Sequence, residues 1–140
     1  MSLLLDTNIL SELRKGPRAN LRLREWFDDV TADEIYLSVL VVGELRRGIE
    51  RVRQRDLKQA AALERGRTRV MTDHAERILP VDASIADQWG RLTAKRPGSV
   101  IDTLMAATAL VHGLVLVTRN VKDVAWTGVS YLNPFDAAPS

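Results

Sequence analysis

Short apolar runs alternate along this chain with longer segments whose apolar residues recur at helical spacing. The runs are brief and rich in leucine, valine and isoleucine, which is typical of buried strands. They lie at 3–6, 35–39, 78–81, 114–118 and 129–132. The helical spacing predicts helices at about 8–15, 19–30, 41–53, 84–95 and 101–112. Strands separated by helices predict an α/β fold, in which helices flank a central parallel sheet on both faces.

Glycines and changes in charge mark the remaining boundaries. Gly113 is predicted to end the apolar helix before the fourth strand. The charged segment 54–77 is predicted to be mostly helical, with a break near Gly66. No linker, repeat or low-complexity stretch divides the sequence, so we expect a single domain over 1–140.

Composition narrows the class of protein. The chain has 140 residues, of which 46% are hydrophobic, enough for a substantial core, and its net charge is only +2. It has no cysteine, which excludes disulfides, thiolate metal sites and thiol catalysis. The longest apolar stretch, 104–117, is shorter than the ~20 residues of a membrane-spanning helix. Because no signal peptide is visible, we expect a cytoplasmic protein without membrane contact.

Three acidic residues lie within or next to apolar segments, where burial of their charge would be costly. Asp6 follows the first strand, Asp102 lies in the first turn of the apolar helix, and Glu44 interrupts the apolar run VLVVGEL. Such acids need cations or protons to offset their charge. All-oxygen ligation, with no cysteine and two histidines, favours Mg²⁺ over zinc, with Mn²⁺ as a substitute. Divalent ions held by carboxylates indicate phosphodiester hydrolysis by metal-activated water.

Each of these acids also has an ordinary structural interpretation. Asp6 is a suitable cap for the helix that follows it, and Asp102 is a first-turn acid favoured by the helix dipole. Glu44 can pair with Arg46 or Arg47 on the protein surface. Taken one at a time, the positions leave both interpretations open.

Three blocks of sequence carry these acids in a specific order. They are LLLDTNILSEL (3–13), YLSVLVVGELRRGI (36–49) and IDTLMAATALVHGLVLVTRNVKDV (101–124). Together they resemble the PIN-domain family, specifically the VapC-type toxins of bacterial toxin–antitoxin pairs. The ending LNPFD (132–136) resembles that of the FitB-like subgroup. Three blocks in family order over nearly the whole chain make the resemblance specific.

The resemblance implies a fold, an activity and partners. It implies a PIN-like parallel sheet and a Mg²⁺-dependent endoribonuclease in which Asp6, Glu44 and Asp102 are catalytic, with Asp6 and Asp102 as metal ligands. The expected substrate is tRNA or ribosomal RNA, and the expected product carries a 5′-phosphate. A cognate antitoxin, VapB-like or FitA-like, is expected to block the acidic cleft. A homodimer, assembled with antitoxin into larger complexes, is also implied.

The residues after the fourth strand depart from the family pattern. Many members carry a fourth acid in a Thr-x-Asp pattern, whereas this chain has Asn120 at that position. Asn120 is expected to complete the catalytic site as a neutral oxygen ligand, with Asp123 as a source of the missing charge. The resemblance assigns Thr118 a supporting hydroxyl that contacts water or phosphate. Asn8 is expected either to orient Asp6 by hydrogen bonding or to cap the first helix.

Basic residues crowd the region that follows Glu44. Candidates for contacts with the RNA backbone are Arg46, Arg47 and Arg51, because cationic helices can follow a phosphate chain. The alternative is that these arginines form ordinary solvated helix faces. The sequence does not choose among the individual arginines.

Two other functions compete with the nuclease. A catalytically weak PIN scaffold that binds RNA or a protein partner is favoured by the neutral Asn120. A Mg²⁺-dependent phosphatase of the haloacid-dehalogenase type also begins with an aspartate at a strand end. That family usually has a second aspartate two residues later, where this chain has Asn8.

Overall fold

A five-stranded parallel sheet forms the centre of the protein in the computed structural model, which describes residues 1–136. The strand order is β3-β2-β1-β4-β5, and every neighbouring pair is parallel. The strands are β1 (Leu3–Leu5), β2 (Ile35–Ser38), β3 (Ile78–Leu79), β4 (Val115–Val117) and β5 (Tyr131–Leu132). The first strand is central, with Leu4 in register with Tyr36 of β2 and Leu116 of β4.

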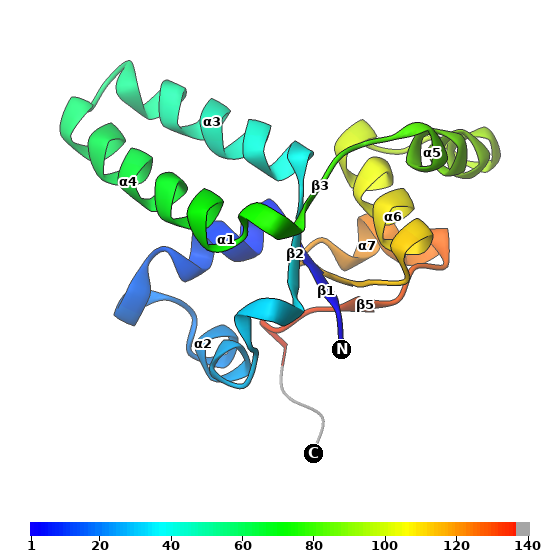
Figure 1. The fold of residues 1–140 in the computed structure, drawn as a ribbon, viewed down its shortest axis with the longest axis horizontal. Helices are drawn as coiled ribbons and strands as arrows, with labels where there is room; N and C mark the ends of the chain where they lie inside the picture. Colours follow the sequence, from blue (N-terminus) through cyan, green and yellow to red (C-terminus); the bar gives the residue numbers. More distant parts are fainter. Residues whose placement is uncertain (137–140) are drawn as a thin grey trace.

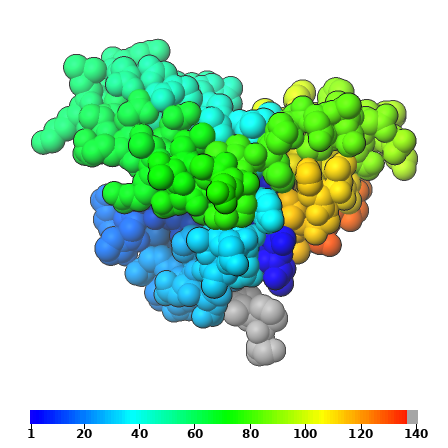
Figure 2. All heavy atoms as spheres, viewed as in Figure 1, coloured from blue at the N-terminus to red at the C-terminus, as the bar shows by residue number. Residues whose placement is uncertain are grey.

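Helices connect these strands and cover the sheet. They are α1 (Thr7–Leu13), α2 (Leu21–Asp28), α3 (Val39–Arg53), α4 (Leu57–Asp73), α5 (Ala83–Lys95), α6 (Val100–His112) and α7 (Val121–Val124). Short 3-10 turns lie at Gly16–Arg18, Ala32–Glu34, Ala75–Arg77 and Ala125–Thr127. In Figure 1, α3 and α4 pack together as an arm on one side, and α5 packs on α6 on the other. The surface is hollowed between these two helix pairs (Figure 2).

The core has two parts because successive strand residues point to opposite faces of the sheet. In β1, Leu4 belongs to one buried cluster, with Ile85 and Met105, whereas Leu3 and Leu5 belong to the other. All three leucines of β1 are 2% exposed or less. This two-sided burial explains why the strand reads as a continuous apolar run, and it confirms the predicted α/β fold class.

The break that the sequence predicted near Gly66 is wrong. Helix α4 runs unbroken through Gly66, and the interruption lies before it, where Asp56 caps the helix by accepting from the Gln59 amide at 2.9 Å. A glycine within a helix costs only about 1 kcal/mol, which packing of α4 on α3 can offset. The sequence also missed α7, since a helix of four residues shows no periodic pattern.

Two glycines provide a matched test of backbone conformation. Gly113 ends α6 with φ +66°, a left-handed conformation that L-residues adopt at a cost of about 1 kcal/mol. We expect Gly113→Ala to lower the free energy of unfolding by about that amount in urea denaturation. Gly66→Ala is the control with the opposite sign, because its position is helical and open, and we expect a gain of about 0.5–1 kcal/mol. Equal effects at the two sites would contradict this account.

Among the described residues, no helix has both the length and the apolar character needed to cross a membrane.

Candidate active site

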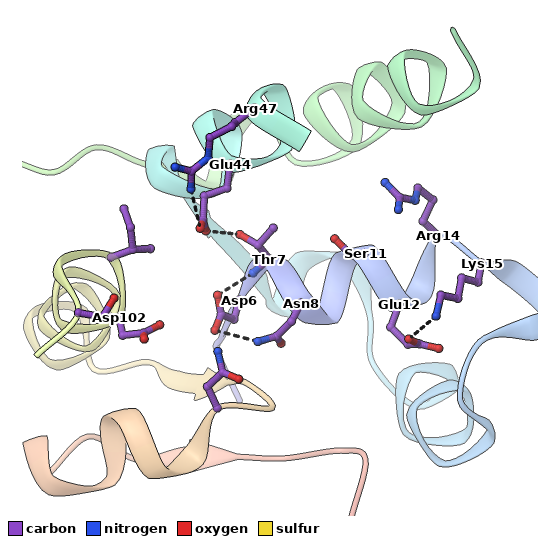
Figure 3. A pocket seen from close by; sticks show the side chains of 13 residues that line it. Asp6, Thr7, Asn8, Ser11, Glu12, Arg14, Lys15, Glu44, Arg47 and Asp102 are labelled. Carbon is purple, nitrogen blue, oxygen red and sulfur yellow. Dashed lines mark hydrogen bonds and ion pairs between the residues drawn. The ribbon is translucent and has the colours of Figure 1, made fainter. Parts of the chain in front are cut away.

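The carboxyl ends of the central strands meet at one edge of the sheet. Asp6 follows β1, Thr118 follows β4, and α3 begins directly after β2 with Ser38 as its cap. A cavity of about 640 Å³ opens at this edge. In Figure 3, Asp102 enters it from α6, Glu44 from α3 and Asp6 from the centre. The structure therefore brings the three predicted acids to one cavity, although they lie far apart in the sequence.

Asp6 is held by three donors. Its Oδ1 accepts from the Thr7 amide at 2.7 Å, and its Oδ2 accepts from Thr118 Oγ1 at 2.7 Å and from Asn8 Nδ2 at 3.3 Å. Asp6 is also the N-cap of α1, so this residue caps the helix and lines the cavity at the same time. With 7% of its surface exposed and three donors, its carboxylate has one fixed orientation.

Asn8 and Thr118 both donate to Asp6, but the predictions made for these two residues differ in outcome. Asn8 donates to Asp6 as predicted, and the alternative in which Asn8 caps the helix is wrong because Asp6 holds that position. Thr118 was expected to contact water or phosphate, but it is fully buried. Its hydroxyl donates to the Asp6 carboxylate and accepts from the backbone amide of Asn120 at 3.0 Å. Thr118 therefore links Asp6 to Asn120, the residue that departs from the family pattern.

Glu44 is fixed between α1 and α3. Its Oε1 accepts from Thr7 Oγ1 at 2.6 Å, and its Oε2 lies 3.7 Å from Arg47 Nη2. The side chain is 24% exposed and lines the cavity, so the surface pair with Arg47 exists but does not remove Glu44 from the site. Because Thr7 donates its amide to Asp6 and its hydroxyl to Glu44, one residue sets the relative position of the two acids.

The pKa values of Asp6 and Asp102 are both raised above that of a solvated aspartate. Burial is the main cause of the raised pKa of Asp6, and the charge of Glu44 adds to it, while the Thr118 and Thr7 hydrogen bonds oppose it. Burial also raises the pKa of Asp102, followed by the charges of Asp6, Asp123 and Glu44. Both groups are therefore harder to ionise than a solvated aspartate, and a cation in the cavity would lower the energy of the ionised forms.

The donors around the cavity are of the kind that Mg²⁺ prefers. Oxygen atoms are available from two aspartates, one glutamate and the side-chain amide of Asn120. Within the described part of the chain, no three Asp, Glu, His or Cys side chains gather closely enough to form a ready-made metal cage. Mg²⁺ usually retains several waters and takes only one or two carboxylates from a protein, so the pair Asp6 and Asp102 fits its requirements. Asp123 lies outside this cavity and lines a neighbouring one.

One side of the cavity was not found from the sequence. Thr7, Ser11, Glu12 and Lys15 line it from α1 and the turn after it, and Arg14 lies beside them (Figure 3). The signal was present, because the positions 7, 8, 11, 12 and 15 fall on one face of a helix.

The three candidate arginines have different environments. Arg46 donates to both carboxylate oxygens of Glu64 at 2.7 and 2.8 Å, so its guanidinium joins α3 to α4. Arg47 lines the cavity, and Arg51 is exposed on α3. Arg47 is thus the candidate that lies beside the acids, although contact with RNA stays a prediction for all three.

The fold and the site together define a class of protein: an α/β domain with a parallel sheet whose strand-end carboxylates line one cavity. Residues 3–122 match the family model described as the PIN domain. The chain belongs to the PIN-domain family, as the sequence predicted.

Relatives place the chain within this family. It is 33% identical to the toxin FitB of Neisseria gonorrhoeae over 95% of this chain and 98% of the relative, and 32% identical to the VapC ribonuclease Y4jK of Sinorhizobium fredii over 97% and 99%. Among solved structures, FitAcB from N. gonorrhoeae has a TM-score of 0.85 at 30% identity, covering 96% and 99% of the chains. A FitAB complex bound to a DNA fragment has a TM-score of 0.87 at 29% identity, covering 98% of each.

Proposed function

We propose that this chain is the toxin of a toxin–antitoxin pair, a Mg²⁺-dependent endoribonuclease that cleaves tRNA or ribosomal RNA. The observation that carries the proposal is the cavity at the carboxyl edge of the sheet, which Asp6, Glu44 and Asp102 all line. Relatives named as a VapC ribonuclease and a FitB toxin support it over almost the full chain. Mn²⁺ is expected to substitute for Mg²⁺ because both take oxygen ligands.

The side chains of the cavity have distinct proposed roles. Asp6 and Asp102 would hold the ion, which when bound lowers the pKa of water and offsets charge on the phosphate. Asp6 meets this role with a carboxylate fixed by its three donors. Glu44 is anchored through Oε1, and its Oε2, which faces Arg47, is the oxygen that would accept the proton of an attacking water. Asn120 adds a neutral amide that can orient that water or a phosphate oxygen without further negative charge.

We also propose a protein partner for the same cavity. Structural relatives were solved as FitAB and FitAcB assemblies, and an antitoxin of the FitA or VapB kind is expected to bind this chain. A cationic side chain of such a partner would be attracted to the acids and would block them from RNA. We further propose that the chain forms a homodimer, which joins with antitoxin into a larger assembly.

Metal removal tests the activity. Total bacterial RNA is incubated with the protein in Mg²⁺, in Mn²⁺ and with a chelator, and new 5′ ends are mapped by sequencing. We expect new 5′-phosphate ends at one or a few positions in either metal, and none with the chelator. A single generic oligonucleotide is a poorer substrate, because an enzyme of narrow specificity would ignore it.

The same assay separates the alternatives. If the protein binds metal and RNA but forms no metal-dependent ends, the binding scaffold replaces the nuclease, with Asn120 as the first residue to examine. Hydrolysis of small phosphate esters without RNA cleavage would indicate the phosphatase.

A further inference from the structure

A second cavity, of about 720 Å³, adjoins the first at Asn120, which lines both. It lies between the ends of β4 and β5 and is bordered by Arg119 and Lys122 on one side and by Tyr131 and Asn133 on the other. The proposed chemistry of the first cavity makes no use of these residues. Because Asn120 lines both cavities, a chain molecule bound at the acids would reach the second cavity past this residue.

The LNPFD ending builds one wall of this cavity. Asn133 Oδ1 accepts from the Phe135 amide at 3.0 Å, which forms a tight turn after β5. The Arg119 guanidinium lies 4.5 Å from the centre of the Phe135 ring, so the turn is also held against the end of β4. The cavity is therefore shaped by fixed elements, and the motif that resembles the FitB-like subgroup has a structural position beside the acids.

Tyr131 supplies an aromatic face at this cavity. It is 46% exposed. Every other aromatic residue among residues 1–136 is at least partly buried, so Tyr131 is the one exposed aromatic side chain in this part of the protein. An aromatic ring in this setting can stack on a nucleobase, which every base permits. The cavity is lined by two cations, Arg119 and Lys122, and by two acids, Asp123 and Asp136. Each cation can pair with a phosphate next to such a base.

We propose that this second cavity binds the nucleotide next to the cleaved phosphodiester, with its base stacked on Tyr131 and its backbone beside Lys122. The site rests on the proposed function for its substrate class, RNA, and extends it to a named subsite. The Asn133 amide nitrogen makes no hydrogen bond within the described residues, so it can donate to the base and contribute to sequence preference.

The test measures RNA binding separately from cleavage. The parent is the Asp102→Asn variant, which is expected not to cleave, and the probe is single-stranded RNA with a randomised segment. Tyr131→Ala on this parent should weaken binding by about tenfold and reduce the base preference at one position, as loss of one stacked base does. Tyr131→Phe keeps the ring and should bind like the parent. Lys122→Gln should lower the slope of log affinity against log salt by about 0.7.

Melting temperatures of all variants check that each is folded. Unchanged RNA affinity in Tyr131→Ala overturns the inference, and so does equal loss in Tyr131→Phe, which would assign the effect to the hydroxyl. A parent that binds none of the RNA pool also overturns it. A Tyr131→Ala variant that keeps its RNA affinity but loses a co-expressed antitoxin would assign the cavity to the protein partner.

Wild-type cleavage distinguishes this inference from the proposed function. If total RNA is cleaved in Mg²⁺ and Tyr131→Ala binds RNA as the parent does, the subsite fails and the nuclease stands. If total RNA is not cleaved and binding still depends on the Tyr131 ring, the nuclease fails and the second cavity stands as an RNA-binding site.

Discussion

Asp102→Asn should abolish RNA cleavage and at the same time raise the melting temperature of the metal-free protein. The cleavage loss is expected to be about 1,000-fold, because a metal site contributes several kcal/mol to stabilising charge in the transition state. The gain in stability follows from burial and the charges of Asp6, Asp123 and Glu44, which raise the pKa of Asp102. An ionised Asp102 therefore destabilises the folded state, and asparagine removes that charge.

The sign of the pH dependence follows from this raised pKa. Below the ordinary value of 3.8 the carboxyl is protonated in both the folded and the unfolded state, so Asp102 carries no penalty. The penalty develops as the pH rises from 3.8 through the raised pKa, and it is complete above it. The advantage of Asp102→Asn in a chelator should thus be full at neutral pH and disappear in acid. The increase is expected to be small, because Asp102 is only partly buried and solvent screens much of its charge.

Metal and a control variant complete this test. Mg²⁺ should raise the melting temperature of the wild type and leave the variant unchanged, because only an intact site gains from binding. Asp87→Asn is the control: this acid is exposed on α5, pairs with Arg91 at 3.0 Å and lies outside the cavity. We expect it to change neither cleavage nor stability measurably. A destabilised Asp102→Asn protein would show that Asp102 is a structural residue, and its inactivity would then say nothing of the metal.

The fold was predictable because its signals are local. Continuous apolar strands such as β1 and β4 require burial on both faces, and parallel strands place their carboxyl ends at one edge. Asp6 and Asp102 were therefore found from their positions next to such elements. The environment of Glu44 was not predictable, since its contact with Thr7 joins residues that are 37 positions apart.

The arginines show where sequence reasoning ends. Arg46 and Arg47 are neighbours of the same type, yet one joins α3 to α4 through Glu64 and the other lines the cavity. Helical spacing places two adjacent residues on different faces, but it does not say which face meets α4. That choice depends on how α3 packs, which is a property of the tertiary structure. The same limit applies to α1, whose cavity-facing side chains share a face that the sequence cannot orient.

Thr118→Val should reduce cleavage by about 10- to 100-fold, the usual effect of removing a group that orients a metal ligand. Valine keeps the shape of threonine but lacks the hydroxyl, which donates to Asp6 at 2.7 Å and accepts from the backbone amide of Asn120 at 3.0 Å. The buried Asp6 carboxylate then lacks one of its three donors, and the expected loss in the free energy of unfolding is about 1–3 kcal/mol. Steady-state cleavage and urea denaturation measure the two effects.

The pH dependence shows whether Thr118 acts through Asp6. The Thr118 hydrogen bond is the largest influence that lowers the pKa of Asp6 against burial, so its loss should raise that pKa further. Protons then compete with Mg²⁺ at higher pH, and the Mg²⁺ concentration for half-maximal cleavage should rise more steeply as the pH falls. Thr108→Val is the matched control, because Thr108 is equally buried but donates to the Leu104 carbonyl within α6. Identical Mg²⁺ requirements in the two variants across pH would show that Thr118 contributes only to stability, since loss of a buried hydroxyl alone does not change the competition between protons and metal at Asp6.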